Sequence, residues 1–547
     1  MNEQNEYKNS SFNIKLPLFM SLALAIGILM GAKFFNTGTT SNDTNVATAK
    51  FREILNLVDK EYVDTVNTDD LSDVAIEKML EHLDPHTVYI KPKDLTMAQA
   101  QLEGEFEGIG IEFQIIKDTL YVVTPISGGP SEAVGLRSGD KIIKINDTTS
   151  TGSILNTQYV FSKLRGKKGT KVKLGIKRAN VAKVLDFTVT RDKIPTFSVD
   201  VSYMIDNTTG YIKISRFAQN TYIEFRNALM KLKQNGAKRL MIDLRDNPGG
   251  YLDRAKYIVD ELLSDGKKIV YTDGKESQYD YTYNADMPGM FEQGALVVLI
   301  NEGSASASEI VSGAIQDNDR GIIVGRRSFG KGLVQRPIPL ETGGELRVTI
   351  SRYYTPSGRS IQKPYTSAED YELDIVNRYK HGEFFNKDSI KFDQKKIYKT
   401  LKGRTVYGGG GIMPDEFVAR DTTDATHYLS DLYNKGVIRE YALNYSTNNK
   451  STLENLGFTN FKTSFEVSKK MMDDFLKLAE KSGVKFDKKQ FDRSEKTIKN
   501  NLKAFIARGI WKNEGFYPIF NESDEIYTRG LMMFEKAKEI EEGPVKK

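Results

Sequence analysis

The sequence predicts an α/β protein whose central part lies between two helical segments. From Gly210 onward, short apolar runs alternate with helical patterns, which is typical of a largely parallel sheet. Residues 105–192 show short strands separated by glycine turns, as a separate small domain would. The segments 48–104 and 421–547 place apolar residues at helical spacing. We therefore expect a small strand-rich domain, an α/β core and helical segments before and after them.

An uncharged apolar run, Leu16 to Ala32, precedes these segments. Its length is near the lower limit for a helix that spans a bilayer. Lys8 and Lys15 lie before the run, and between residues 34 and 49 no basic residue occurs. This asymmetry predicts that the N-terminus is cytoplasmic and that the rest of the chain lies outside.

We accordingly expect a cytoplasmic tail at 1–15 and a transmembrane anchor at 16–35. The alternative is a cleaved signal peptide. The sequence Ala47-Thr48-Ala49 resembles a signal-peptide cleavage site, but it lies far from the apolar run. This distance favours an uncleaved anchor. The part of the chain that follows the run would then be extracytoplasmic, in the periplasm.

Composition excludes several classes of protein. The 547 residues contain no cysteine, so thiol nucleophiles, thiolate metal sites and disulfides are absent. The four histidines form no His-Glu-x-x-His pair, and we expect neither a metal nor another cofactor. The net charge of +5 is small for this length, and acidic and basic residues interleave, so no nucleic-acid partner is expected.

The small domain at 105–192 resembles a PDZ domain in the order of its elements. A strand opens at Gly108-Ile109-Gly110-Ile111, a second follows at Leu120–Val123, and a short helix begins at Pro130. In PDZ domains the glycine loop binds a peptide C-terminal carboxylate through backbone amides, and the peptide adds as a strand. The resemblance assigns this role to the amides of Ile109, Gly110 and Ile111, and the expected partners are proteins or peptides with exposed apolar C-termini.

The α/β core, 193–420, is predicted from alternating elements. Its expected strands and helices, in order, are Tyr211–Ile214, a helix at Tyr222–Gln234, Leu240–Asp243, a helix at Leu252–Leu263, Ile269–Tyr271, Leu296–Ile300 and Ile322–Val324. The loop Asp243-Leu244-Arg245-Asp246-Asn247-Pro248-Gly249-Gly250 ends one strand. It is either an ordinary glycine turn or a loop with free amides at the sheet edge where ligands collect.

The stretch Asn301-Glu302-Gly303-Ser304-Ala305-Ser306-Ala307-Ser308-Glu309 connects the apolar run at 296–300 to a helical pattern. Small residues at such a strand-to-helix turn can hold a serine nucleophile beside backbone amides that stabilise an oxyanion. The alternative is that the serines only cap the helix. Residue patterns alone do not choose among Ser304, Ser306 and Ser308.

A lysine between two glycines follows one strand later, in Ser328-Phe329-Gly330-Lys331-Gly332. Burial can depress a lysine pKa by roughly 3–5 units and make the amine a general base. A phosphate-binding Walker A loop is rejected, because Gly332 replaces the required hydroxyl residue and a strand pattern follows. Lys331 is the more economical base for a serine, although a Ser-His pair using His86 is left open.

The remaining segments show no catalytic pattern. A polar stretch at about 366–404 reads as an insertion in the core, and Gly408–Asp415 closes it. The C-terminal region is charged and helical, with Trp511, Phe516 and Tyr517 in an expected turn between helices. We expect the C-terminal region to serve in packing or in the assembly of a homo-oligomer.

Taken together, these motifs resemble the C-terminal processing (tail-specific) peptidases, which are Ser-Lys serine proteases with a PDZ domain. The resemblance runs from about residue 48 to 418 and includes Leu83-Asp84-Pro85-His86, the PDZ pattern, residues 243–250 and 301–309, Phe329–Gly332 and Gly409–Asp415. It implies a ClpP/crotonase-like mixed α/β protease core.

The resemblance also implies roles for single residues. It places the nucleophile on Ser306, the base on Lys331 and the glutamine that orients the lysine on Gln335. The oxyanion hole would comprise the Ala307 amide and a glycine amide of the Pro-Gly-Gly turn. Gly249 is our first choice for that glycine, and Gly250 is the alternative.

Some family members use a PDZ arginine to couple ligand binding to activity. Arg165 fits that position. The expected function is that of a membrane-anchored, extracytoplasmic serine endopeptidase that binds protein C-termini. The alternative is a catalytically silent PDZ scaffold that recruits envelope proteins.

Overall fold

The computed structural model describes residues 20–21, 42–126, 128–178, 181–365, 368–391, 393 and 395–543. The chain divides into two units, Met1–Met79 and Leu80–Lys547. The predicted cytoplasmic tail and, apart from residues 20 and 21, the predicted anchor lie outside the described residues. Within the described ranges, no helix has the length and apolar character needed to span a membrane.

The segment predicted to be helical at 48–104 is not helical throughout. It contains α2 (Asn42–Glu61), α3 (Thr68–Glu81) and α4 (Pro92–Glu103), but also a strand, β1 (Val88–Ile90). β1 pairs antiparallel with β18 (Glu345–Tyr354), more than 250 residues later in the chain. The expectation of a purely helical segment was wrong because this strand depends on a distant partner and not on local periodicity.

A PDZ-like domain follows. Its sheet has the order β3-β4-β5-β7-β8, with β6 beside β5 and with β3 at one edge. Its elements are β3 (Ile111–Ile116), β4 (Thr119–Pro125), α5 (Pro130–Ala133), β5 (Lys141–Ile145), β6 (Thr148–Thr149), α6 (Thr157–Leu164), β7 (Lys171–Lys177) and β8 (Leu185–Thr190). β2 (Glu105–Gly108) and β9 (Asp192–Pro195) pair at the entry and exit of this domain.

The core contains the predicted, largely parallel sheet, of order β10-β11-β12-β15-β16-β21. Only the β10–β11 pair in this sheet is antiparallel. Its strands are β10 (Val199–Met204), β11 (Thr209–Ile214), β12 (Arg239–Asp243), β15 (Leu296–Ile300), β16 (Ile322–Gly325) and β21 (Glu416–Phe417). The apolar run at Ile269–Tyr271, which was expected in the same sheet, lies in a different sheet.

That run lies in β13 (Lys268–Gly274) of a second, antiparallel sheet. β13 pairs with β14 (Thr282–Asn284) and with β18, and β18 also pairs with β17 (Leu333–Pro339). The expectation that it belonged to the parallel sheet was wrong, because a short apolar strand does not specify its partner. The second sheet matters for function, since Lys331 lies two residues before β17.

Both faces of the parallel sheet are covered. Along β15, Leu296, Val298 and Ile300 pack with helices α7 (Thr221–Gln234), α8 (Leu252–Asp260) and α9 (Ala307–Asp317). Val297 and Leu299, which point to the opposite face, pack with α17 (Glu525–Met532) and α18 (Phe534–Glu542). Burial on both faces explains the continuous apolar run of β15.

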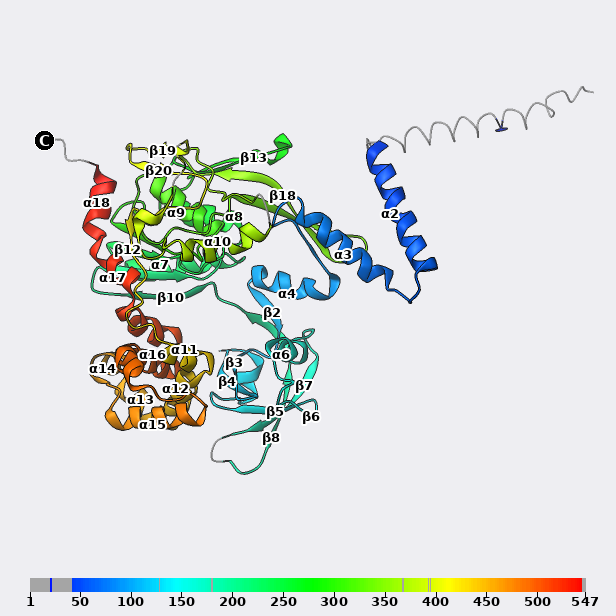
Figure 1. The fold of residues 1–547 in the computed structure, drawn as a ribbon. Coiled ribbons are helices and arrows are strands. Elements are labelled where there is room, and N and C mark those ends of the chain that lie inside the picture. Colours follow the sequence, from blue (N-terminus) through cyan, green and yellow to red (C-terminus); the bar gives the residue numbers. More distant parts are fainter. Residues whose placement is uncertain are drawn as a thin grey trace, which may run out of the picture. The chain divides into compact units, whose positions relative to one another are not determined.

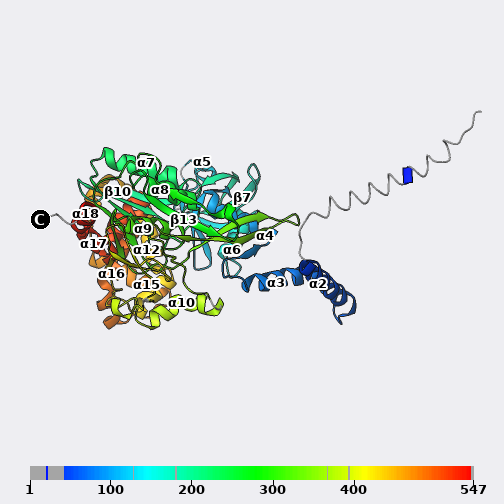
Figure 2. The ribbon, with the colours of Figure 1, turned by 90° about the horizontal axis from the view of Figure 1, so that it is seen from above.

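The last two helices therefore complete the core, although they come from the region predicted as a separate helical segment. They are drawn in red and lie beside the core in both ribbon views (Figure 1, Figure 2). The other helices of this region are α11 (His427–Asn434), α12 (Val437–Asn448), α13 (Lys450–Leu456), α14 (Phe458–Ser464), α15 (Lys469–Lys481) and α16 (Lys488–Phe520).

The turn expected around Trp511 is a kink inside α16. Trp511 and Lys512 have non-helical backbone angles, whereas Phe516 and Tyr517 lie in the helix that continues beyond them. Ion pairs join this region to the PDZ-like domain, between Arg508 and Glu112 at 2.6 Å and between Glu440 and Lys117 at 3.0 Å.

Candidate active site

Ser306 lies at the turn between β15 and α9. It has φ 56° and ψ −114°, a backbone conformation that residues other than glycine rarely adopt. Such strain costs roughly 1–3 kcal/mol and is kept where the surrounding structure enforces it, often at active sites. A serine held in this way at the start of a helix is typical of a nucleophile.

The three serines of this turn have different environments. The Ser304 hydroxyl donates to the carbonyl oxygen of Leu244 at 2.8 Å, and the Ser308 hydroxyl donates to that of Asn247 at 2.9 Å. Both serines are fully buried. Ser306 is partly exposed, and its hydroxyl donates to no acceptor among the described residues. Ser306 is thus the serine whose hydroxyl is available for chemistry.

The backbones of Ser306 and Lys331 are held together by one tyrosine. The Tyr353 hydroxyl lies 3.0 Å from the carbonyl oxygen of Ser306 and 2.5 Å from that of Lys331. Tyr353 comes from β18 and is fully buried. The antiparallel sheet that holds Tyr353 therefore brings the segment of Lys331 against the serine turn.

Glu309 provides a second connection between the same two residues. Its Oε2 accepts hydrogen bonds from the backbone amides of Ser306 and Lys331, each at 2.8 Å. Its Oε1 accepts from the Ser328 hydroxyl at 2.5 Å and from the Gly330 amide at 2.7 Å. Burial raises the pKa of Glu309 to about 7, although these four donors favour the carboxylate. The motif at 301–309 ends with Glu309 but did not indicate that its carboxylate joins these two segments.

Lys331 has the electrostatic environment of a base. Burial lowers the pKa of its ammonium, while the carboxylates of Glu309 and Asp84 oppose that shift. A lower pKa means that more of the amine is neutral at a given pH. The Gln335 amide, on the next strand, donates from Nε2 to the Thr349 hydroxyl at 3.3 Å.

Two of the amides predicted for the oxyanion hole differ in availability. The Gly249 amide donates to Oδ1 of Asn247 at 2.9 Å, so in this conformation it is not free for a ligand. A Cβ added at Gly249 would lie 2.7 Å from the Cβ of Ser306, which shows how closely this loop approaches the serine. Among the described residues, the amides of Gly250 and Ala307 donate to no acceptor. The geometry therefore favours Gly250 as the glycine donor, while the oxyanion hole itself stays a prediction.

Comparison with known proteins identifies the family. A model of peptidase family S41 matches residues 208–373, and a PDZ domain model matches residues 108–190. A carboxy-terminal-processing protease of Bartonella bacilliformis is 38% identical over 394 residues, which cover 71% of the chain and 88% of that protein.

The chain belongs to the carboxy-terminal processing protease family.

The chain is similar to further proteins. The carboxy-terminal processing protease CtpA of Bacillus subtilis is 32% identical over 380 residues, covering 68% of the chain and 78% of that protein. The solved photosystem II D1 C-terminal processing protease covers 68% of the chain at 25% identity, with a TM-score of 0.34. Residues 428–512 match a family of unknown function. As a member of peptidase family S41, the protein is a serine-type endopeptidase with a PDZ domain.

The pH dependence of this protease should identify its base. If Lys331 is the base, kcat/KM rises with pH as the ammonium loses its proton, and the limb ends below the ordinary lysine pKa. Lys331→Arg keeps the charge but cannot deprotonate usefully, so it should be as inactive as Lys331→Ala. Peptide hydrolysis measured from pH 3 to 11 tests this expectation.

His86 is the alternative base, and it would give a different pH dependence. Burial, followed by the field of Lys331, lowers the pKa of His86 to about 4. Its Nε2 lies 2.6 Å from the Tyr371 hydroxyl. A rate limb near pH 4 that disappears in a folded His86→Ala variant, together with an active Lys331→Arg variant, would assign the base to His86 instead.

The polar insertion of this protease bonds to the segment that precedes Lys331. Its helix α10 (Ala368–Lys380) carries Tyr371, which contacts His86, and Arg378. The Arg378 guanidinium donates to the carbonyl oxygens of Ser328 at 3.0 Å and Arg327 at 2.7 Å. The insertion therefore supports the loop that leads to Lys331, which its polar composition did not reveal.

The glycine loop of the PDZ domain has backbone amides that are available to a ligand. Gly110 has φ 70°, and among the described residues the amides of Ile109 and Gly110 donate to no acceptor. Ile111 begins β3, the edge strand of the PDZ sheet. An end strand of a sheet beside amides that donate to no acceptor is the arrangement that strand addition of a peptide requires.

Arg165, the predicted coupling residue, lies in the PDZ domain, directly after the last residue of α6. Its guanidinium carbon lies 4.2 Å from the ring centre of Phe161 and 4.8 Å from that of Phe106. Burial lowers its pKa. Among the described residues, Nε of Arg165 has no hydrogen-bond partner. These contacts do not test coupling to the catalytic residues, which stays a prediction.

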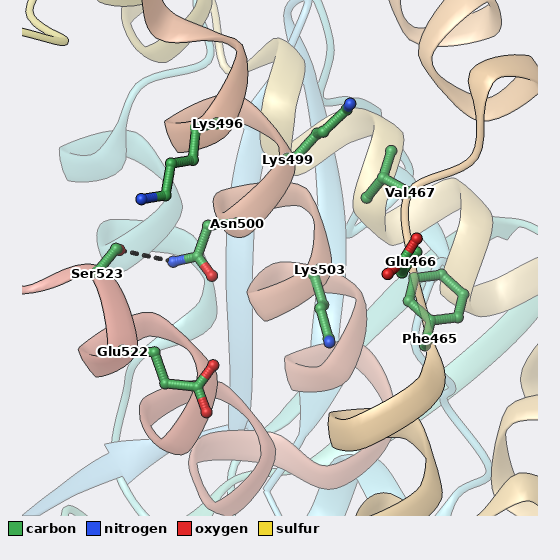
Figure 3. A pocket seen from close by; sticks show the side chains of 9 residues that line it. All are labelled: Phe465, Glu466, Val467, Lys496, Lys499, Asn500, Lys503, Glu522 and Ser523. Carbon is green, nitrogen blue, oxygen red and sulfur yellow. Dashed lines mark hydrogen bonds between the residues drawn. The ribbon is translucent and has the colours of Figure 1, made fainter.

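A separate cavity of about 350 Å³ lies in the C-terminal helical region (Figure 3). Lys496, Lys499 and Lys503 of α16 line it, together with Glu466 and Glu522. It includes none of the candidate catalytic or PDZ residues, so it is not the peptidase site.

Proposed function

We propose that the protein is a membrane-anchored, extracytoplasmic C-terminal processing endopeptidase that cleaves through a Ser306–Lys331 dyad. The observation on which the dyad depends is the double connection between the two residues. The Tyr353 hydroxyl contacts both carbonyl oxygens, and Glu309 accepts from both amides. These bonds fix two segments that are separate in the sequence against each other.

In the proposed reaction, neutral Lys331 accepts the Ser306 hydroxyl proton while the serine oxygen attacks the scissile carbonyl carbon. The amides of Ala307 and a glycine of the Pro-Gly-Gly turn stabilise the resulting oxyanion. The lysine then donates its proton to the leaving amine, and an acyl-enzyme forms. Water, deprotonated by Lys331, attacks the ester and releases Ser306.

The PDZ domain is proposed to bind the substrate's C-terminus. Its glycine loop offers amides to a carboxylate, and the β3 edge offers a strand to pair with. The relatives named as carboxy-terminal processing proteases support this assignment. Binding at the PDZ domain would hold the chain near the core, where Ser306 cleaves it.

The proposed location rests on the sequence before residue 36. The apolar run Leu16–Ala32 and the lysines before it favour a single anchor with a cytoplasmic N-terminus. The PDZ domain and the protease core would then act outside the cytoplasmic membrane, on envelope proteins.

Blocking the substrate's carboxylate is expected to weaken both binding and cleavage. An amidated tail loses the charge-assisted hydrogen bonds that a free carboxylate accepts from backbone amides, each worth roughly 1.5–3 kcal/mol. Two such bonds correspond to a loss of at least about a hundredfold in tail affinity. Cleavage and binding of free-acid and amidated versions of one apolar-tailed protein measure this effect.

The same experiment separates the proposal from a silent scaffold. A scaffold would bind the free-acid tail and leave the protein intact, even at high enzyme concentration. Equal cleavage of the free-acid and amidated substrates would remove tail recognition from the function but keep the peptidase.

A further inference from the structure

The loop Leu83–Thr87 is a motif of this chain that the proposed chemistry does not use. It precedes β1, whose residue Val88 pairs with Arg347 of β18. That pairing places the loop beside Thr349, two residues further along β18. Thr349 in turn is the cross-strand partner of Gln335 in β17. The loop thus lies behind the glutamine that is predicted to orient Lys331.

Asp84 is the centre of this loop and is buried, with 8% of its surface exposed. Its Oδ1 accepts from the amides of His86 at 2.8 Å and Thr87 at 2.9 Å, and from the Thr349 hydroxyl at 3.1 Å. Its Oδ2 accepts from the Thr87 hydroxyl at 2.5 Å. Amide N–H groups can only donate, so Oδ1 is fixed as an acceptor.

The direction of these bonds determines the orientation of Gln335. A threonine hydroxyl has a single proton, and the proton of Thr349 is directed to Asp84. Thr349 can therefore only accept from Gln335, which must present its NH₂ group, as observed at 3.3 Å. The other polar atom of the side-chain amide is its carbonyl oxygen, Oε1. That oxygen is left to accept a hydrogen bond from an N–H donor.

We propose that Asp84 and Thr349 are positioning residues of this peptidase, which orient the Gln335 amide so that its oxygen accepts from the Lys331 amine. The inference rests on the proposed role of Lys331 as the base. An accepted N–H bond would direct the nitrogen lone pair toward Ser306. Electrostatics agree with this arrangement, because Lys331 lowers the pKa of His86 and Asp84 opposes the fall in the pKa of Lys331.

Thr349→Val tests the proposal, because valine has a similar shape but no hydroxyl. We expect kcat to fall roughly five- to tenfold, the equivalent of one hydrogen bond of about 1–1.4 kcal/mol, with little change in KM. The acid limb of the rate should move to lower pH, because an ammonium that loses an acceptor is easier to deprotonate. Thr349→Ser, which keeps the hydroxyl, should recover most of the lost kcat.

Two comparisons make the test specific. Thr188→Val changes an exposed strand threonine of β8 in the same way and should leave kcat and the pH profile unchanged. In a Gln335→Ala background, Thr349→Val should have no further effect, because Thr349 acts only through Gln335. Melting temperatures of all variants show whether they are folded.

An unchanged kcat and pH profile in folded Thr349→Val would overturn the proposal. Multiplying effects of Thr349→Val and Gln335→Ala would do the same, since Thr349 would then act by another route. Failure of the dyad is recognised separately: an active Lys331→Arg variant would show that Lys331 is not the base, whatever Thr349 does.

Discussion

Ser306→Ala is expected to lower kcat/KM for a tailed protein substrate by about 10⁴-fold or more, because it removes the nucleophile of an acyl-enzyme mechanism. The protein should stay folded. The Ser306 hydroxyl donates to no acceptor among the described residues, so its loss leaves no buried carbonyl unpaired. A serine-reactive probe should label the wild-type protein at Ser306 and should not label the variant.

The neighbouring serines serve as matched controls. Ser304→Ala and Ser308→Ala each remove a buried hydroxyl that bonds to a backbone carbonyl, at a cost of roughly 1–3 kcal/mol in stability. Both should lower the melting temperature yet keep the nucleophile and the label. Turnover retained in pure Ser306→Ala but lost in a folded Ser304→Ala or Ser308→Ala variant would show that another serine is the nucleophile.

Removing α17 and α18 is expected to unfold the protease core. Four buried side chains of these helices and of the residue between them, Ile526, Tyr527, Met533 and Phe534, cover one face of the parallel sheet. At roughly 1.5–3 kcal/mol each, their burial contributes about 6–12 kcal/mol, comparable to the whole stability of a typical domain. A chain ending at residue 520 should be insoluble or lack a cooperative thermal transition and peptidase activity.

A single substitution gives a graded version of this result. Phe534 is 2% exposed and lies under the Arg239 guanidinium, whose carbon is 4.7 Å from the ring centre. Phe534→Ala should cost roughly 3–5 kcal/mol. Met532→Ala, at a position that is 63% exposed, should stay within about 0.5 kcal/mol of the wild type. A soluble, active chain ending at residue 520 would show that these helices are dispensable.

Much of the fold could be predicted from local patterns. The alternation of apolar runs and helical segments after Gly210 predicted the parallel sheet, and the order of the short elements within 105–192 predicted the PDZ domain. Periodicity and turn residues are local properties, so they can be recognised in the sequence alone. The partner of a short strand is not local. β1 and β13 were therefore misassigned, because their pairing with β18 depends on the packing of the whole domain.

The candidate site divides in the same way. The sequence by itself determined which residue types could act, a serine turn before a helix and a lysine between glycines, because both depend on neighbouring residues. It left Ser304, Ser306 and Ser308 equivalent, and the family resemblance chose among them. Only the tertiary structure showed which hydroxyl donates to no backbone carbonyl, since the other two donate to the distant loop at 243–250. It also decided that Tyr353, Glu309 and the loop at 83–87 support the dyad, because contacts between segments so far apart in the chain are set by packing and not by any local pattern.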